Sequence, residues 1–440
     1  MRILYSLLFT LSIPFILLYF AVRGLRHRDY LSRWGERFGF VQPGNRAGGI
    51  LLHAASVGEY NAASPLLKAL LKQYPNLPLI VTTLTPTGAE RIRQDLGDKV
   101  FHSYLPLDFP AAVSRFLNRA KPQLIIVMET EIWPNFYFQA QRRSIPLLIA
   151  NARLSETSVG RYLRLSRLVR AALQSVTWTG AQSAEDAERL IRCGTRPQHT
   201  IVSGNLKFDL QVPAGLSEQG KALRSRWNPA RPVLVAGSTH EADENVILPA
   251  FKGLLESIPD ALLILVPRHP ERFARSVQAA RATGLRVEMY SEGETCSPQT
   301  QCFVIDTMGK LMTFYACADV TFVGGSMGTQ GGHNALEPAA LGKPVMVGPN
   351  TANAKEIVNE LIECGAALRI SNQQSFQACA EALLGDGLLR DRMGQAGLAL
   401  VEKNKGSLKL TLDAIDRQLS RYSEPSNPDI SPRRTTKRNI

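Results

Sequence analysis

Short apolar runs alternate with segments of helical periodicity from residue 50 onward. Twelve runs of three to six residues are rich in Val, Ile and Leu, and helical patterns lie between them. This alternation is typical of parallel strands that are buried on both faces and connected by helices. The predicted strands are 50–54, 79–83, 100–104, 124–128, 147–150 and 175–180 in the first half, and 233–236, 262–266, 287–290, 302–305, 320–323 and 345–347 in the second.

The stretch 211–232 interrupts this series with Pro and Gly and is predicted to be a linker region. We therefore expect two doubly wound α/β domains of similar size, at 30–210 and 233–420, with no sequence repeat between them. Ligands of such sheets bind beyond the carboxyl ends of the strands, so a cleft between the domains is the expected site.

The N-terminal segment 3–22 is apolar and carries no charge. Twenty such residues are about enough to span a bilayer as a helix. Arg23, Arg26 and Arg28 follow at once, and positive charges favour the cytoplasmic side. A retained single-pass anchor at 3–22, with the body of the protein on the cytoplasmic face of the inner membrane, is the favoured interpretation. A helix that lies in the membrane interface and a cleaved signal peptide are the alternatives.

The chain is basic, with a formal net charge of +13. The segment 421–440 is rich in Pro and Ser as well as basic, and we expect it to be disordered. Basic segments beside a membrane anchor favour contact with anionic lipid of the inner membrane. Nucleic acid is the rival partner, and the sequence disfavours it because no nucleic-acid-binding motif occurs. The six cysteines form no CxxC pair, which favours reduced thiols over disulfides.

A glycine-rich loop at 324–332 follows the predicted strand 320–323 and precedes a helix start near His333. Glycines allow close approach of a ligand, and a helix start offers free N–H groups to phosphate. Glu337, in the first turns of that helix, could bind ribose hydroxyls. The loop also matches G-x-S-x-G around Ser326, but the further glycines delay the helix and disfavour a serine hydrolase. The dinucleotide and P-loop glycine motifs do not occur.

Charged residues follow several predicted strands. Arg268 follows the strand 262–266, and Lys310 lies at the corner after 302–305, where both could bind phosphate. Glu59 begins an amphipathic helix after the first strand, and we expect the helix dipole to keep it ionised at neutral pH. Glu129 and Lys207 are, on the pattern alone, best explained as solvated charges.

Seven ordered motifs carry a family resemblance. They are HAASVGE at 53–59, METEIWPN at 128–135, NARLS at 151–155, GNLKFD at 204–209, PRHPERF at 267–273, DTMGKL at 306–311 and GGHNALEPAALGKPV at 331–345. Together they resemble the 3-deoxy-D-manno-octulosonic acid (Kdo) transferases of lipopolysaccharide synthesis. The resemblance extends from the N-terminal segment to about residue 420 and does not include the basic tail.

The resemblance implies a GT-B fold, with an N-terminal acceptor domain and a C-terminal nucleotide domain. It also implies inverting transfer of Kdo from CMP-Kdo to the lipid A precursor (lipid IVA), with no metal and no other cofactor. By position, Glu59 resembles the catalytic base, and Glu129 and Lys207 resemble the residues that stabilise the transition state. The implied CMP contacts are Pro267, Arg268, Met308, Gly309, Lys310, Asn334, Ala335, Leu336 and Glu337.

An arginine stripe at Arg161, Arg164, Arg167 and Arg170 has i, i+3 spacing within 153–173. On one helix it would form a basic face for acceptor phosphate or lipid headgroups, and a merely solvated face is the alternative. His333 and Glu337 share a helix face, but no third metal ligand is evident. Two other functions remain open: another membrane-anchored GT-B transferase that uses a different nucleotide sugar, and a non-catalytic nucleotide- or lipid-binding membrane module.

Overall fold

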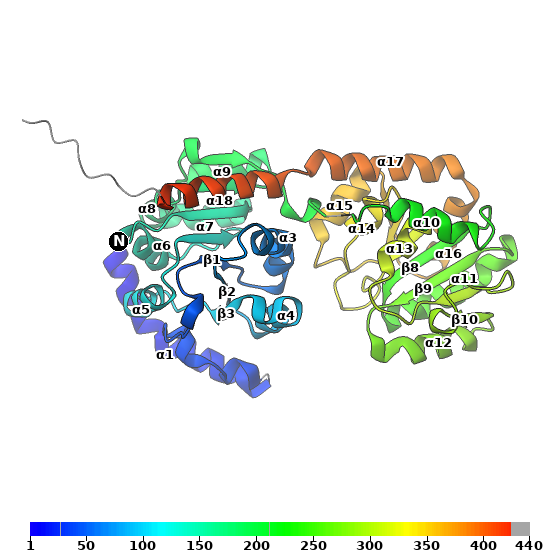
Figure 1. Cartoon of the computed structure of the whole chain (residues 1–440), viewed down its shortest axis with the longest axis horizontal. Helices are drawn as coiled ribbons and strands as arrows, with labels where there is room; N and C mark the ends of the chain where they lie inside the picture. Colours follow the sequence, from blue (N-terminus) through cyan, green and yellow to red (C-terminus); the bar gives the residue numbers. More distant parts are fainter. Residues whose placement is uncertain (27, 211, 424–440) are drawn as a thin grey trace, which may run out of the picture. The chain divides into compact units, whose positions relative to one another are not determined.

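The computed structural model describes the chain except residues 27, 211 and 424–440. The chain forms two compact units, each built on a seven-stranded parallel sheet (Figure 1). The first unit contains Met1–Lys207 together with residues 406–423, and the second contains Phe208–Lys405.

The first sheet has the strand order β3-β2-β1-β4-β5-β6-β7, with every pairing parallel. Its strands are β1 (Ile50–His53), β2 (Leu79–Thr83), β3 (Phe101–Tyr104), β4 (Leu124–Met128), β5 (Leu147–Ala152), β6 (Trp178–Ala181) and β7 (Thr200–Val202). Its helices are α1 (Arg2–Arg26), α2 (Trp34–Arg37), α3 (Val57–Gln73), α4 (Pro86–Leu96), α5 (Pro110–Ala120), α6 (Pro134–Arg142), α7 (Glu156–Arg164), α8 (Ser166–Leu173), α9 (Ala184–Cys193) and α18 (Ser407–Ser423). The strand order reverses beside β1, which is where such sheets bind ligands.

The second sheet has the order β10-β11-β9-β8-β12-β13-β14, also all parallel. Its strands are β8 (Val233–Thr239), β9 (Leu262–Pro267), β10 (Val287–Met289), β11 (Cys302–Val304), β12 (Val320–Val323), β13 (Val345–Val347) and β14 (Ala367–Arg369). Its helices are α10 (Leu216–Ser225), α11 (Glu241–Ser257), α12 (Phe273–Ala282), α13 (Leu311–Cys317), α14 (Leu336–Ala339), α15 (Lys355–Glu363), α16 (Gln373–Gly385) and α17 (Gly387–Asn404). Here the order reverses between β8 and β12.

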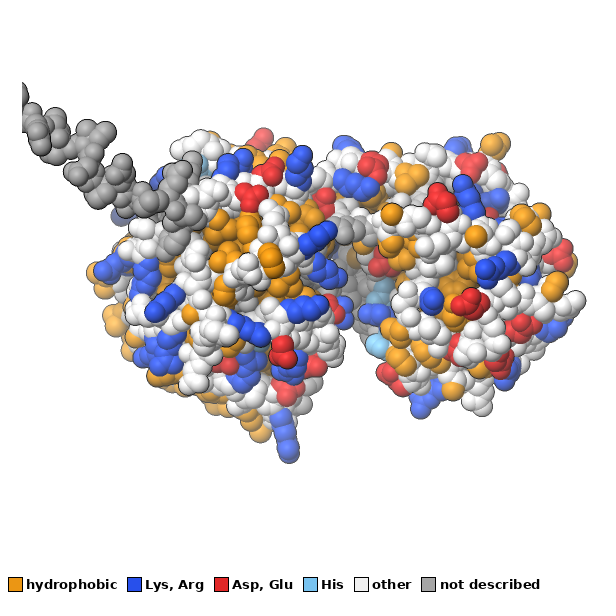
Figure 2. Space-filling view, viewed as in Figure 1, with side chains coloured by type: hydrophobic (Ala, Val, Ile, Leu, Met, Phe, Trp, Pro, Cys, Tyr) orange, Lys and Arg blue, Asp and Glu red, His pale blue; other side chains and the backbone are white. Residues whose placement is uncertain are grey.

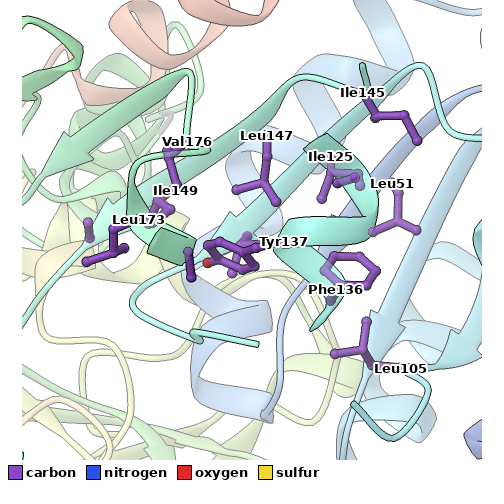
Figure 3. Close-up of a cluster of buried hydrophobic side chains, with 14 of the residues drawn as sticks. Leu51, Leu105, Ile125, Phe136, Tyr137, Ile145, Leu147, Ile149, Leu173 and Val176 are labelled. Carbon is purple, nitrogen blue, oxygen red and sulfur yellow. The ribbon is translucent and has the colours of Figure 1, made fainter. Parts of the chain in front are cut away.

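Both faces of the first sheet are buried, which explains its uninterrupted apolar strands. Leu51, Ile125 and Ile149 lie on one face and pack with Phe136 and Tyr137 of α6 (Figure 3). The intervening residues of the same strands belong to a second cluster with α3 and α18. The helices that follow β1 and β4 are thus fixed by packing, and their first residues lie at the carboxyl edge of the sheet.

All twelve predicted strands are present, and their ends differ from the prediction by at most three residues. The prediction missed β7 and β14, which are three-residue strands at sheet edges. The expected linker 211–232 contains α10, which packs closely on α13: a Cβ atom at Gly220 would lie 2.7 Å from Ala316 Cβ. This segment is therefore part of the second unit.

The expected end of the second domain, at residue 420, also differs from the structure. The division lies at Lys405, and α18 belongs to the first unit because Ala414 and Ile415 are buried in its core. The Asp416 carboxylate accepts hydrogen bonds from Tyr74 and from Gln73 at the end of α3. Of the tail expected at 421–440, residues 424–440 lie outside the described part of the chain.

A protein ending at Lys405 should therefore lose stability in the first unit, although it lacks no part of the second. Losing the burial of the Ile415 side chain alone lowers the free energy of unfolding by about 1.5–3 kcal/mol. Differential scanning calorimetry should show a lowered or missing transition for the first unit and an unchanged one for the second. A truncation after Ser423, which keeps all of α18, is the control and should melt like the full chain.

Candidate active site

Glu59 lies in the first turn of α3, at the carboxyl end of β1. Ser56 caps the helix, and its hydroxyl accepts the Glu59 N–H at 3.4 Å. The Glu59 carboxylate in turn accepts the Ala55 N–H at 2.7 Å and the Ser56 hydroxyl at 3.3 Å. The sequence S-V-G-E thus forms a reciprocal cap that fixes the side chain, so Glu59 has a structural role at this corner.

Two further carboxylates lie near Glu59, at the end of the neighbouring strand β4. Glu129 follows β4 directly and has φ of 55°, a left-handed conformation that is uncommon outside glycine. Its N–H donates to the Ala150 carbonyl of β5 at 2.9 Å. Glu131, two residues further on, is partly buried, and burial raises its pKa. The carboxyl edge of the first sheet therefore gathers three acids from two adjacent strands.

This environment raises the pKa of Glu59 to about 8. Burial is the main cause, the Ala55 N–H opposes it, and the negative charges of Glu131 and Glu129 add to it. The expectation that the helix dipole keeps Glu59 ionised at neutral pH is therefore wrong. The dipole is worth only about 0.3–1 kcal/mol, which burial and two like charges outweigh.

Lys207 is tied to the next strand, β5. The Leu206 N–H donates to Asn151 Oδ1 at 2.9 Å, and the Lys207 N–H donates to Asn205 Oδ1 at 3.1 Å. Asn151 is buried and has φ of 57°, so it also adopts the left-handed conformation. The loop that carries Lys207 is therefore held at the carboxyl edge on which Glu59 and Glu129 lie.

In the second unit, Pro267 ends β9 and Arg268 follows it, with its N–H bonded to the Thr239 carbonyl of β8 at 3.0 Å. Three histidines gather around Arg268. The Nε2 atoms of His240 and His333 are 3.0 Å apart and their rings stack, and the His269 ring packs edge-on against His240. Burial, Arg268 and the other histidines lower the pKa of His333 to about 4. His333 is thus neutral near pH 7, and the positive charge beside it comes from Arg268.

The glycine-rich loop after β12 binds a carboxylate of its own chain. Asp243, fully buried on α11, accepts the N–H groups of Gly325, Ser326 and Met327 at 2.7, 3.2 and 3.0 Å. Those N–H groups are therefore not free for a phosphate, contrary to the simplest interpretation of the motif. The Ser326 hydroxyl is buried and donates to the Val323 carbonyl at 2.6 Å, so it is not an exposed nucleophile.

The four residues 334–337 lie at the start of α14, a helix of only four residues. Asn334 donates to the Glu337 carboxylate at 3.2 Å, and burial raises the pKa of Glu337 while Asn334 and Arg268 oppose the shift. The side chains of Ala335 and Leu336 are buried in the core, which leaves only their backbone for a ligand. The loop is anchored because the His333 N–H donates to the Gly324 carbonyl at 3.1 Å.

The corner before α13 is more open. Met308 is 51% exposed, and Gly309 has φ of +82° with no neighbouring heavy atom where a Cβ would lie. The Lys310 ammonium lies 5.7 Å from the centre of the Tyr290 ring. Among the described residues, no group of three or more His, Cys, Asp and Glu side chains has the arrangement of a metal site.

Comparison with known proteins gives the family. Residues 32–210 match the model of the 3-deoxy-D-manno-octulosonic-acid transferase (kdotransferase) family. The chain is 39% identical to the 3-deoxy-D-manno-octulosonic acid transferase of Haemophilus influenzae, over 96% of this chain and 99% of that protein. The chain belongs to the Kdo transferase family. The transferase of Bordetella pertussis is 35% identical over 88% of this chain and 90% of its own.

The fold of this Kdo transferase also has a solved counterpart. The crystal structure of MurG from Acinetobacter baumannii matches 84% of this chain and 99% of its own, with a TM-score of 0.53 and 15% identity. The expected α/β fold of the GT-B type is confirmed. Family membership makes the protein a glycosyltransferase that transfers Kdo in lipopolysaccharide biosynthesis.

The arginine stripe of this Kdo transferase does not lie on one helix, contrary to the sequence prediction. Helix α7 ends at Arg164 and α8 begins at Ser166, so Arg161 and Arg164 belong to one helix and Arg167 to the next. The break lets Val169 and Leu173 of α8 reach the core. All three arginines and Arg170 are exposed.

Sequence reasoning missed two residues of the second unit, Asp243 and His240. A signal existed, because H-E-A-D at 240–243 follows a predicted strand and is typical of a helix start. It did not reveal that the Asp243 carboxylate reaches a loop more than eighty residues later in the chain.

Proposed function

We propose that this Kdo transferase moves Kdo from CMP-Kdo to the lipid A precursor, lipid IVA, with inversion of configuration. The reaction would take place at the cytoplasmic face of the inner membrane. The observation that carries the proposal is the group of three carboxylates, Glu59, Glu129 and Glu131, at the carboxyl edge of the first sheet. A module that only binds nucleotide or lipid has no use for a base fixed in this way.

On the acceptor side, Glu59 takes the proton of a sugar hydroxyl as that oxygen attacks the anomeric carbon of Kdo. A carboxylate with a pKa of about 8 is a stronger base than an ordinary one. Glu129 and Lys207 stabilise the transition state from the ends of β4 and β5. Glu129 is suited to the positive charge that develops on the sugar ring, and Lys207 to negative charge.

On the donor side, CMP leaves with its phosphate oxygen, on which negative charge grows. Arg268 and Lys310 supply positive charge to that phosphate. Pro267, Met308 and Gly309 have no charged side chain, so they bind the nucleotide mainly through van der Waals contacts and backbone groups. Residues Asn334–Glu337 bind it through the Asn334 side chain, two backbone positions and the Glu337 carboxylate. These cationic groups let the reaction proceed without a metal or other cofactor.

Transfer should increase with pH between 7 and 9. With a pKa of about 8, roughly a tenth of Glu59 is ionised at pH 7 and most of it at pH 9, so the rate should rise by up to about tenfold. Stability should change in the opposite direction. The folded state holds the proton up to about pH 8, whereas an unfolded Glu loses it near 4.5, so Glu59 destabilises the fold increasingly from pH 4.5 to about 8. Initial rates across the range in which transfer should increase, and urea unfolding from below pH 4.5 to above pH 8, check the two expectations. A flat rate profile would contradict the role of Glu59.

Replacing Arg161, Arg164 and Arg167 with Ser should weaken binding to anionic acceptor or vesicles by several fold at low salt, and less at high salt. CMP affinity should not change, because all three residues lie in the first unit. Sedimentation with vesicles at two salt concentrations measures the effect. The control replaces Arg91 and Arg93 of α4. An equal loss of vesicle binding in that variant would mean that the arginine stripe is an ordinary solvated surface.

The proposed reaction is tested with purified protein, CMP-Kdo and lipid IVA in the presence of EDTA. Mass spectrometry should show an acceptor heavier by Kdo, and NMR should show inverted anomeric configuration. Parallel reactions with UDP- and ADP-sugars test the alternative of another donor. Transfer from one of those sugars and none from CMP-Kdo would overturn the proposal.

A further inference from the structure

One face of α1 is covered by the first unit along the whole helix. The partly or fully buried residues recur at helical spacing from Arg2 to Gly24: they are Arg2, Tyr5, Ser6, Phe9, Ser12, Ile13, Ile16, Leu17, Phe20, Ala21 and Gly24. The opposite face holds exposed apolar side chains, among them Leu4, Leu8, Phe15 and Leu18. The helix therefore runs along the surface of the unit (Figure 1), and hydrophobic side chains appear at that border of the unit in Figure 2.

Polar contacts hold the N-terminal end of α1. The Tyr5 hydroxyl donates to the Asp108 carboxylate at 2.9 Å, and the Ser6 hydroxyl donates to Asn135 Oδ1 at 2.8 Å. Asp108 is almost fully buried, and it also accepts the N–H groups of Asn135 and Phe136 at 2.9 and 2.8 Å. Tyr5 thus completes the hydrogen bonds of a buried carboxylate at the start of α6.

Aromatic contacts hold the C-terminal end. The Phe20 ring stacks on Tyr30 at 6.1 Å and meets Trp34 edge-on at 6.4 Å. The Arg37 guanidinium lies 4.4 Å from the centre of the same ring. Residues 5 and 20 are fifteen positions apart, which is about 22 Å along a helix. Both ends of α1 therefore contact the first unit through side chains.

This attachment cannot coexist with a helix that crosses the bilayer. The hydrocarbon core is about 30 Å thick, so Tyr5 of a spanning helix would lie near its far side. Asp108 and the start of α6 would have to follow Tyr5 into the hydrocarbon. Exposed Arg142 of α6 lies over the same Phe138 ring as Arg2 of α1, so it would go with them, and a charge is costly there.

We propose that α1 lies in the plane of the membrane, with its exposed face in the lipid of the leaflet that also contacts the first unit. The apolar side chains of that face insert among the acyl chains. Exposed arginines at the border of the helix and on the neighbouring helices, among them Arg23, Arg28 and Arg142, meet anionic headgroups. The length and hydropathy of α1 alone would also permit a span. The contacts with Asp108 and Arg37 decide between the two.

Side-specific labelling in native membranes tests the proposal. The reporter is a cysteine in a short polar extension before Met1, in a chain with Cys364 replaced by Ser. The control is the unmodified chain, in which Cys364 is the one exposed cysteine of the described residues and reports the side of the body. An in-plane helix requires that a membrane-impermeant maleimide label both cysteines from the same side. Labelling of the extension from the opposite side would overturn the proposal.

Cross-linking tests the docked position directly. The pair Ser6→Cys and Asn135→Cys should form a disulfide upon mild oxidation of membranes that contain the full-length protein, because the two side chains are in contact. The control pair is Phe15→Cys and Asn135→Cys, since Phe15 is 74% exposed on the other face. Absence of the first disulfide in a variant that still binds CMP, or equal yields from the two pairs, would mean that α1 leaves the unit. Neither test depends on which sugar is transferred.

Discussion

Replacing Glu59 with Gln should lower the rate of Kdo transfer by about 10²–10⁴-fold while the protein stays folded and binds CMP normally. The amide oxygen of Gln can still accept the Ala55 N–H, so the reciprocal cap of α3 is largely kept. What is lost is the group that can take a proton. A purely structural Glu59 would show the reverse, with lower stability and retained transfer.

The measurements are initial rates with lipid IVA, melting temperature and CMP affinity by calorimetry. At pH 8 the variant should melt no lower than the parent, because removal of a buried acid also removes the cost of ionising it. Glu90→Gln, on the exposed surface of α4, is the matched control and should leave all three quantities unchanged. If Glu59→Gln kept more than about a tenth of the parent rate, Glu59 would not be the base.

Replacing Asp243 with Ala should abolish measurable CMP binding and destabilise the second unit by about 3–5 kcal/mol. Three buried N–H groups of the loop after β12 would lose their acceptor, at about 1–3 kcal/mol each before the loop relaxes. The carbonyls of Gly325 and Gly324 in the same loop accept the N–H groups of residues 332 and 333. A displacement of the loop would therefore also displace Asn334 and Glu337.

Glu244→Gln is the control for Asp243. Glu244 is the next residue of α11, is buried, and pairs with Arg272 and Ser276 rather than with the loop. Its replacement should also lower stability, but CMP affinity of the folded protein should be kept. Chemical denaturation and calorimetry separate the two effects. Equal CMP affinity in Asp243→Ala and the parent would show that the loop does not position the nucleotide site.

The strands could be predicted because each is an apolar run buried on both faces, a pattern that depends only on local sequence. The edge strands β7 and β14 are half-covered and three residues long, so they leave no such pattern. Helix α18 has an ordinary amphipathic sequence, and nothing in it indicates which core it covers. The break at Leu165 follows from the position of the core under α8, which periodicity within 153–173 cannot reveal.

The candidate site was predictable in part for a related reason. Arg268 and Lys310 follow strands, and parallel strands end at one edge, so their location at the carboxyl edge of the second sheet could be expected from topology. The raised pKa of Glu59 could not, because it depends on burial and on Glu131 and Glu129 from a strand seventy residues later. Asp243 was missed because its partners are backbone N–H groups, which have no signature in the sequence.

The position of α18 has a consequence for the order in which the two units can fold. The chain leaves the ribosome from its N-terminus, and domains generally fold as they emerge. The first unit, however, lacks Ala414 and Ile415 of its core until the entire second unit has been synthesised. During translation the second unit can therefore complete its core first, while the apolar surface under α18 stays uncovered. That surface, on a nascent chain that also carries α1, is where we expect a chaperone to bind.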